Sequence, residues 1–233
     1  MTLFPEDIST YGHEIDNLFY LILIFSGLAF IISLFALLYP VFIKRAKANY
    51  FTGDKWSHVK WVAIPVILLA GADFVILYVE HGTWKKVEES PAKTDLQIGI
   101  TGRQWNWIFT YPGPDNQLYT SDDIVVDEMD GSLHVPVNKT VEINLRARDV
   151  IHSFSVPNLR FKQDALPGRN ITRWIQATKA GKFEIQCAEI CGILHGKMRN
   201  FLLVESESDY LNYLKGLIKP EKKETADLVS VSK

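Results

Sequence analysis

The segment between Gln186 and Met198 concentrates side chains that could bind a metal ion. Its candidate ligands follow one another at spacings of four, four and three residues: Cys187, Cys191, His195 and Met198. A second imidazole, His152, stands earlier in the motif Asp-Val-Ile-His-Ser-Phe. Two thiols, two imidazoles and one thioether form a soft nitrogen and sulfur set, which favours copper.

The second cysteine and the second histidine point to two copper ions rather than one. A blue-copper centre is built from a cysteine, histidine and a weak axial methionine. With two thiolates, both sulfurs could bridge a pair of coppers, each holding one imidazole and a weaker ligand. One electron shared over two metals changes each bond little, so such a centre suits electron transfer.

Other uses of the two cysteines remain open from these residues. A disulfide between Cys187 and Cys191 is possible in an oxidising compartment, but it leaves His195 and Met198 unexplained. Structural zinc binds two cysteines and two histidines readily, but it has no need of the thioether. His152 taken alone would be an ordinary strand residue, so its assignment depends on the loop.

The loop lies in a region whose pattern predicts an all-β domain. Short stretches rich in β-branched and aromatic residues alternate with turn signals and favour a sandwich or Greek-key barrel. The expected strands cover residues 96–111, 133–137, 140–147, 150–156, 171–176, 181–186 and 200–204. A closing helix is expected at 207–218, and the charged tail 220–233 is expected to be disordered.

Two apolar stretches precede this domain. Residues 18–39 carry no charge, and residues 61–79 carry only Asp73. About 20 apolar residues match the thickness of a bilayer, so we expect transmembrane helices at about 18–43 and 58–80. Acidic residues precede the first stretch and no small-residue cleavage site follows it, which argues against a signal peptide. Two buried helices of a soluble protein are the alternative.

Charges beside these stretches predict the topology. The loop between them is basic, and basic loops stay on the cytoplasmic side. Its charged residues are Lys44, Arg45, Lys47, Lys55 and Lys60 against Asp54. The predicted organisation is therefore an outer segment (1–17), a hairpin (18–80), an outer β domain (81–219) and the tail. With a net charge of -2, nucleic acid is not an expected partner.

Four motifs resemble the cytochrome c oxidase subunit II family. They are Cys-Ala-Glu-Ile-Cys with the trailing His195 and Met198, Asp-Val-Ile-His-Ser-Phe-Ser-Val-Pro, Asp-Ala-Leu-Pro-Gly-Arg, and Gly-Arg-Gln-Trp-Asn-Trp. The resemblance extends from the hairpin to the closing helix. It implies a two-helix transmembrane hairpin followed by an all-β cupredoxin-like domain, and a binuclear CuA centre.

The resemblance also implies roles for single residues. Cys187 and Cys191 would bridge the two coppers, with His152 and Met198 on one and His195 and the Glu189 carbonyl on the other. The Glu189 side chain would reach a magnesium ion at the boundary with subunit I. Trp105 would be the exposed ring through which electrons enter, whereas Trp107 is expected in the core. Asp164 and Arg169 would contact subunit I.

By this resemblance the chain would accept electrons from cytochrome c. It would pass them to the haem of subunit I, where oxygen is reduced to water with proton translocation. The absence of an arginine-rich leader favours a bacterial inner membrane, with the copper domain in the periplasm. The alternatives are a membrane-tethered copper carrier or assembly protein, and a quinol oxidase subunit II, which would lack the copper ligands.

Three further features each carry two interpretations. Asp73 could conduct protons or contact a partner helix, because a carboxyl group is costly in lipid. His58 stands where many relatives carry a glutamate at a proton entry, so its part in proton uptake is open. The acidic stretch could steer a basic cytochrome or be a solvated loop; it comprises Asp122, Asp123, Asp127, Glu128 and Asp130.

Overall fold

The chain folds into two compact units, which we describe separately. The computed structural model describes residues 3–42, 53, 55–89, 91, 93–129 and 131–218. The first unit is Met1–Lys93 with Asn158–Arg160, and the second is Thr94–Pro157 with Phe161–Lys233. The predicted basic loop residues Lys44, Arg45 and Lys47, with Asp54, lie outside the described residues, as does the tail 220–233.

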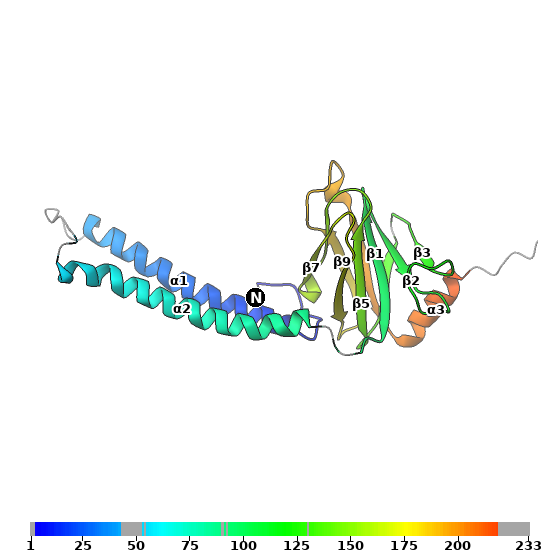
Figure 1. Cartoon of the computed structure of the whole chain (residues 1–233), viewed down its shortest axis with the longest axis horizontal. Helices are drawn as coiled ribbons and strands as arrows, with labels where there is room; N and C mark the ends of the chain where they lie inside the picture. Colours follow the sequence, from blue (N-terminus) through cyan, green and yellow to red (C-terminus); the bar gives the residue numbers. More distant parts are fainter. Residues whose placement is uncertain are drawn as a thin grey trace, which may run out of the picture. The chain divides into compact units, whose positions relative to one another are not determined.

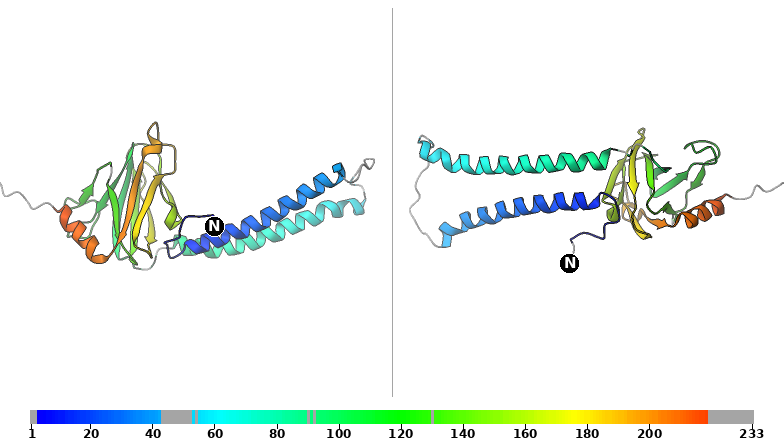
Figure 2. Two further views of the ribbon diagram at one scale, coloured as in Figure 1. Left: turned by 180° about the vertical axis from the view of Figure 1, so that it is seen from behind. Right: turned by 90° about the horizontal axis from the view of Figure 1, so that it is seen from below.

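Two long helices form the first unit: α1 (Gly12–Phe42) and α2 (Trp56–Glu88). They lie side by side (Figures 1 and 2), and Glu14 near the start of α1 pairs with Lys86 near the end of α2, so the helices are antiparallel. Both are long and apolar enough to cross a membrane. Helix α1 begins before its expected start at residue 18, and α2 extends past both expected ends, so the predicted boundary at residue 81 falls inside α2. A helix can continue in water after its lipid-facing part ends.

The second unit contains two five-stranded sheets (Figure 1). The first sheet has the order β3-β2-β1-β5-β8: Ile124–Val126, Asn106–Tyr111, Leu96–Arg103, Thr140–Ala147 and Ile171–Gln176. The second sheet has the order β4-β10-β9-β6-β7: Ser132–Pro136, Arg199–Glu205, Gly181–Cys187, His152–Val156 and Phe161–Ala165. An apolar helical hairpin followed by an all-β domain therefore confirms the predicted fold class.

Several strands differ from the sequence expectation. The expected strand 96–111 is a hairpin, since β1 and β2 pair from Gly99↔Thr110 to Arg103↔Asn106. Strands β3 and β7 were not expected, because neither carries enough alternating apolar residues to stand out from its turns. Two pairs are parallel, β1 with β5 and β4 with β10.

Apolar side chains from both sheets form the core. The large side chains that are fully buried include Ile98, Ile143, Leu133 and Phe154. Trp107 is also fully buried, which confirms its predicted place in the core; its ring meets Phe154 edge-on at 5.2 Å.

The closing helix, α3 (Glu207–Leu217), lies at one end of the sandwich (Figure 2). It begins after Ser206, whose hydroxyl oxygen accepts a hydrogen bond from the Asp209 amide at 3.2 Å. Its Tyr210 is buried, with its ring 6.3 Å from that of Tyr111. A capped, amphipathic helix of this kind covers an end of the core.

Candidate metal centre

The candidate ligand loop is closed at its base by two paired strands. Cys187 is the last residue of β9, and β10 starts at Arg199, directly after Met198. The two strands pair from Arg199↔Gln186 onward, and the Cys187 amide donates to the Met198 carbonyl at 3.2 Å. The first and last candidate ligands of the loop are thus held next to each other.

Strand β6 brings the fifth candidate ligand to the loop. Phe154 pairs with Cys187 across β6 and β9, and the Ala188 amide donates to the Ser153 carbonyl at 2.9 Å. His152, the first residue of β6, is completely buried. Its ring lies 5.9 Å from that of Trp107. A Cβ on Gly102 would lie 2.9 Å from the His152 ring, so glycine is required there by close approach.

The two cysteines are free thiols, and their sulfur atoms lie 3.8 Å apart. A disulfide would need about 2.05 Å, so the disulfide alternative is not the state of this structure. One imidazole accompanies each sulfur: His152 Nδ1 is 4.0 Å from Cys187 Sγ, and His195 Nδ1 is 3.5 Å from Cys191 Sγ. The ligand atoms of His152, Cys187 and Cys191 all lie within 4.8 Å of one another.

Two weaker donors complete the cluster. The buried Met198 thioether sulfur lies 3.8 Å from Cys191 Sγ, and the Glu189 carbonyl oxygen lies 3.3 Å from Cys187 Sγ. Ligands bound to one soft metal at roughly 2.0–2.3 Å lie about 3.3–4.0 Å apart at tetrahedral to trigonal angles. The spacings between neighbouring donors fall in this range, so the donor set fits a bound metal. The Glu189 side chain is exposed.

The Asp149 carboxylate orients the His152 ring. Its Nε2 lies 2.9 Å from Asp149 Oδ1, and this leaves Nδ1 facing Cys187. Burial lowers the pKa of His152, but its contacts with Cys187 and Asp149 outweigh burial and raise it. A histidine that donates one ring N–H to a carboxylate presents the other nitrogen as a metal ligand.

The two thiols ionise differently. Burial opposes ionisation of Cys187, but hydrogen bonds with His152 and with the backbone lower its pKa to about 6. Burial and the neighbouring charge of Cys187 raise the pKa of Cys191 to about 12. One thiolate is therefore present near neutral pH. The second would form if a cation were bound, because metal binding displaces ligand protons.

Trp105 lies against the ligand loop. It is half-buried in the turn between β1 and β2, and a Cβ on Gly192 would lie 3.1 Å from its indole nitrogen. The neighbouring Gln104 donates from its side-chain nitrogen to the Cys191 carbonyl at 2.7 Å. The residue before the predicted entry ring is thus hydrogen-bonded to the backbone of a predicted copper ligand.

Comparison with known proteins identifies the family of this chain. Residues 96–206 match the family model for the cytochrome c oxidase subunit II periplasmic domain. A cytochrome c oxidase subunit 2 from Cereibacter sphaeroides is 30% identical over 89% of this chain and 76% of its own length. The chain belongs to the cytochrome c oxidase subunit II family.

Two further comparisons cover different shares of the chain. A probable cytochrome c oxidase subunit 2 from Rickettsia conorii is 35% identical over 84% of this chain, and the chain spans 65% of its length. The crystal structure of the periplasmic domain of subunit II from Bradyrhizobium japonicum is 33% identical, with a TM-score of 0.49, and covers 55% of this chain and 96% of its own.

For this member of the subunit II family, the sequence identified the candidate ligands but not the residues that hold them. Asp149 and Gln104 stand inside the quoted motifs, yet no role was assigned to either. A carboxylate three residues before a candidate histidine ligand was the available signal for Asp149. No sequence signal placed Gln104 next to Cys191, because that contact joins two distant loops.

Proposed function

We propose that the chain is the electron-entry subunit of a haem–copper cytochrome c oxidase. The observation that carries the proposal is the pair of free thiols 3.8 Å apart with one imidazole beside each sulfur. Neither a disulfide nor a single tetrahedral zinc site accounts for this doubled set together with the buried Met198. A binuclear copper site of the CuA type does account for it.

The ligands of this site would be divided over two positions. Cys187 and Cys191 would bridge the ions, with His152 and Met198 completing one and His195 and the Glu189 carbonyl completing the other. Two coppers held in this way would take up and release one electron at a time. The exposed Glu189 carboxylate would bind a magnesium ion at the boundary with subunit I.

Residues of the chain would carry the electron to the site and hold the ligands still. Trp105 is the proposed entry point, because its ring packs on the loop at Gly192 and its neighbour Gln104 binds the Cys191 carbonyl. Asp149 keeps His152 in the orientation that binds metal. Ligands fixed before the electron arrives lower the rearrangement that transfer requires.

The remaining parts of the assembly would be separate chains. The exposed apolar surfaces of α1 and α2 fit lipid and the membrane helices of subunit I, which would hold the haems and the oxygen chemistry. A c-type cytochrome would supply the electrons. By the charge of the loop between the helices, the copper domain would face the periplasm of a bacterial inner membrane.

Purification in mild detergent tests this proposal against a stand-alone copper carrier or assembly protein. We expect the chain to co-purify with haem and to hold two coppers. The oxidised site should be purple, with an electron paramagnetic resonance spectrum of one electron shared over two copper nuclei. A single-copper spectrum would contradict the site, and a two-copper spectrum without haem would favour the carrier.

Two variants sharpen the assignment. Cys191→Ser should abolish the two-copper spectrum, because one bridge is lost. Met198→Leu should retain both coppers and shift the reduction potential, since an axial thioether tunes the metal more than it holds it. Equal loss of copper in both variants would contradict the proposed difference between bridging and axial ligands.

A further inference from the structure

The segment that leads into α1 binds the connection between β6 and β7. Residues Asn158–Arg160 of this connection belong to the first unit, together with the helices. The Ile8 amide donates to the Asn158 carbonyl at 2.9 Å, and the Asn158 side-chain nitrogen donates to the Glu6 carbonyl at 2.9 Å. We call residues 3–16 the N-terminal strap. The strap therefore holds the connection through hydrogen bonds in both directions.

Arg160 adds a two-pronged ion pair to these contacts. Its Nε and one terminal nitrogen donate to the two carboxylate oxygens of Asp16 at 2.7 and 2.8 Å. The same terminal nitrogen donates to the Pro5 carbonyl at 2.8 Å, and the guanidinium carbon lies 5.2 Å from the centre of the Phe4 ring. The side chains of Arg160 and Asp16 are only 8% and 20% exposed. A paired contact of this kind fixes geometry as well as charge.

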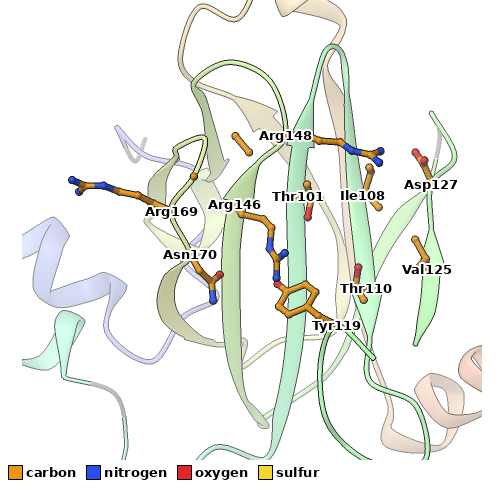
Figure 3. Close-up of a pocket in the computed structure, with 12 residues that line it drawn as sticks. Thr101, Ile108, Thr110, Tyr119, Val125, Asp127, Arg146, Arg148, Arg169 and Asn170 are labelled. Atoms are coloured by element: carbon orange, nitrogen blue, oxygen red, sulfur yellow. The ribbon is translucent and has the colours of Figure 1, made fainter. Parts of the chain in front are cut away.

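Other arginines are held less firmly than Arg160. In a groove of about 670 Å³ on the first sheet, Arg146 stacks on the Tyr119 ring at 3.2 Å (Figure 3). Arg103 pairs with Asp127 at 2.8 Å, but both side chains are more than one-third exposed. Exposed ion pairs contribute little, whereas a largely buried pair resists separation, because each charge would lose its partner away from water.

The backbone at Arg160 is strained. Its φ is 54°, a left-handed conformation that glycine adopts readily and that other residues adopt at a cost. Glycine at this position would relieve the strain but could not bind Asp16. The arginine side chain therefore gives the connection an ion pair at the expense of backbone strain, which is typical of a residue with a specific role.

The N-terminal strap has a fixed conformation where it joins α1. Asp7 accepts hydrogen bonds from the Ser9 amide at 2.9 Å and from the Ser9 hydroxyl at 3.0 Å. The Ser9 hydroxyl oxygen accepts from the Gly12 amide at 2.7 Å. A Cβ on Gly12 would overlap the Asp7 carboxylate, so glycine is required there. Ile8 and Tyr11 are buried. The strap is thus a structured extension of α1.

Strand β6 joins the Arg160 ion pair to a candidate copper ligand. His152 and Val156, the first and last residues of β6, are fully buried, as is Leu159 in the connection. The strand pairs with β7 along its whole length and with β9 at Cys187. Because a close-packed strand moves as one piece, a displacement of the connection reaches His152.

We propose that Arg160 is a positioning residue for the electron that leaves the copper site. Its pair with Asp16, at the start of α1, holds β6 at a set distance from the membrane helices and so from the haem of subunit I. The copper site loses one electron and the haem gains one, without any bond or proton transferred. This inference rests on the proposed electron-entry function and concerns the second of its two transfers.

The test uses the intact, copper-loaded oxidase complex with a photosensitiser and a sacrificial electron donor. A light flash reduces the copper site, and absorbance then gives two rate constants, one for copper reduction and one for transfer to the haem. Arg160→Gly should slow the transfer to the haem about tenfold, because small displacements of reacting groups have effects of this size or larger. Copper reduction and the paramagnetic resonance spectrum should be unchanged, since glycine suits this backbone.

Further variants test the geometry of the pair. Asp16→Asn should also slow the transfer to the haem. Arg160→Lys keeps the charge but loses the two-pronged contact, so its rate should lie between those of Arg160→Gly and the unaltered chain. The exchange Asp16→Arg with Arg160→Asp should recover part of the rate. Glu14→Gln is the matched control, because it removes a carboxylate of the same helix end that pairs with Lys86 instead.

The possible results separate the positioning role from the electron-entry function. Unchanged transfer to the haem in Arg160→Gly, or equal slowing by Glu14→Gln, would overturn the positioning role and leave the function intact. Loss of the copper spectrum in Arg160→Gly would also overturn it and assign the ion pair to folding of the copper site. An exchange variant no faster than Asp16→Asn would contradict direct pairing. No transfer to haem in the unaltered complex would overturn both the positioning role and the function.

Discussion

The ligand loop and the helical hairpin are stabilised in opposite ways. In the loop, each candidate ligand is surrounded by partners from the same unit, from the β9–β10 base to the Asp149 carboxylate. In the hairpin, large apolar side chains such as Phe35, Phe74 and Tyr78 are more than 70% exposed. The loop therefore needs only its own fold, whereas the helices need lipid or other chains to cover them.

This difference matters for electron transfer. A site that must hold ligands still benefits from an environment that is complete before any partner binds. A membrane anchor has the opposite requirement, because its apolar side chains must stay exposed on the helix surface to contact lipid or another subunit. We therefore expect the two regions to behave independently.

The largest expected effect is separation of the two units. Residues 94–218, expressed alone, should be soluble and bind copper with the spectrum of the full chain, because the core lies inside that unit. Residues 3–89 should require detergent or lipid, because their apolar surface would aggregate in water. Size-exclusion chromatography and copper spectra measure both. An insoluble β unit would contradict the independence inferred here.

Thiol reactivity tests the loop without metal. In the metal-free full chain, alkylation of Cys187 should rise with pH and level off above about pH 7, since its pKa is about 6. Cys191 should react more than about 100-fold more slowly at pH 7, because only the thiolate is nucleophilic. Peptide mapping by mass spectrometry separates the two residues. In urea, the two cysteines should be alkylated at equal rates. Equal rates in the folded chain would contradict the inferred difference in pKa between the two thiols.

Removing the carboxylate behind His152 should weaken metal binding. Asp149→Ala is expected to lower copper affinity about 10- to 100-fold, as is typical for residues that orient a ligand. Asp149→Asn should recover much of this loss, because its carbonyl can still accept from His152. Competition with a copper chelator gives the affinities. Unchanged affinity in the alanine variant would mean that β6 alone orients the imidazole.

A smaller effect is expected where the loop meets Trp105. Gly192 has a φ of 128°, and an added Cβ would lie 3.0 Å from the Gln104 side-chain nitrogen. Gly192→Ala should reduce the free energy of unfolding by about 1–3 kcal/mol and loosen the Gln104–Cys191 contact. Gly196→Ala is the matched control, because nothing lies within 4 Å of its added Cβ. Denaturant unfolding measures the free energy of unfolding of both variants. An equal loss of stability in the two would contradict the steric strain expected at Gly192.

The sequence by itself determined the types and spacing of the candidate ligands, the two apolar helices and the all-β character of the rest. These properties are local: a loop between two strands keeps its ligands within a few residues, and an apolar run needs no partner to be recognised. For this reason, His195 and Met198 could be proposed as ligands from the sequence. The limits of β5 and β8 were also predicted, because each is a single uninterrupted strand.

Only the tertiary structure decided which distant residues meet. The β6–β9 pairing brought His152 to Cys187, the β1–β2 turn set Gln104 against Cys191, and the parallel β1–β5 pair aligned Thr101 with Arg146. Each contact depends on the register of strands far apart along the chain. Side-chain patterns constrain which face of a strand is buried, but they do not specify its neighbour in the sheet.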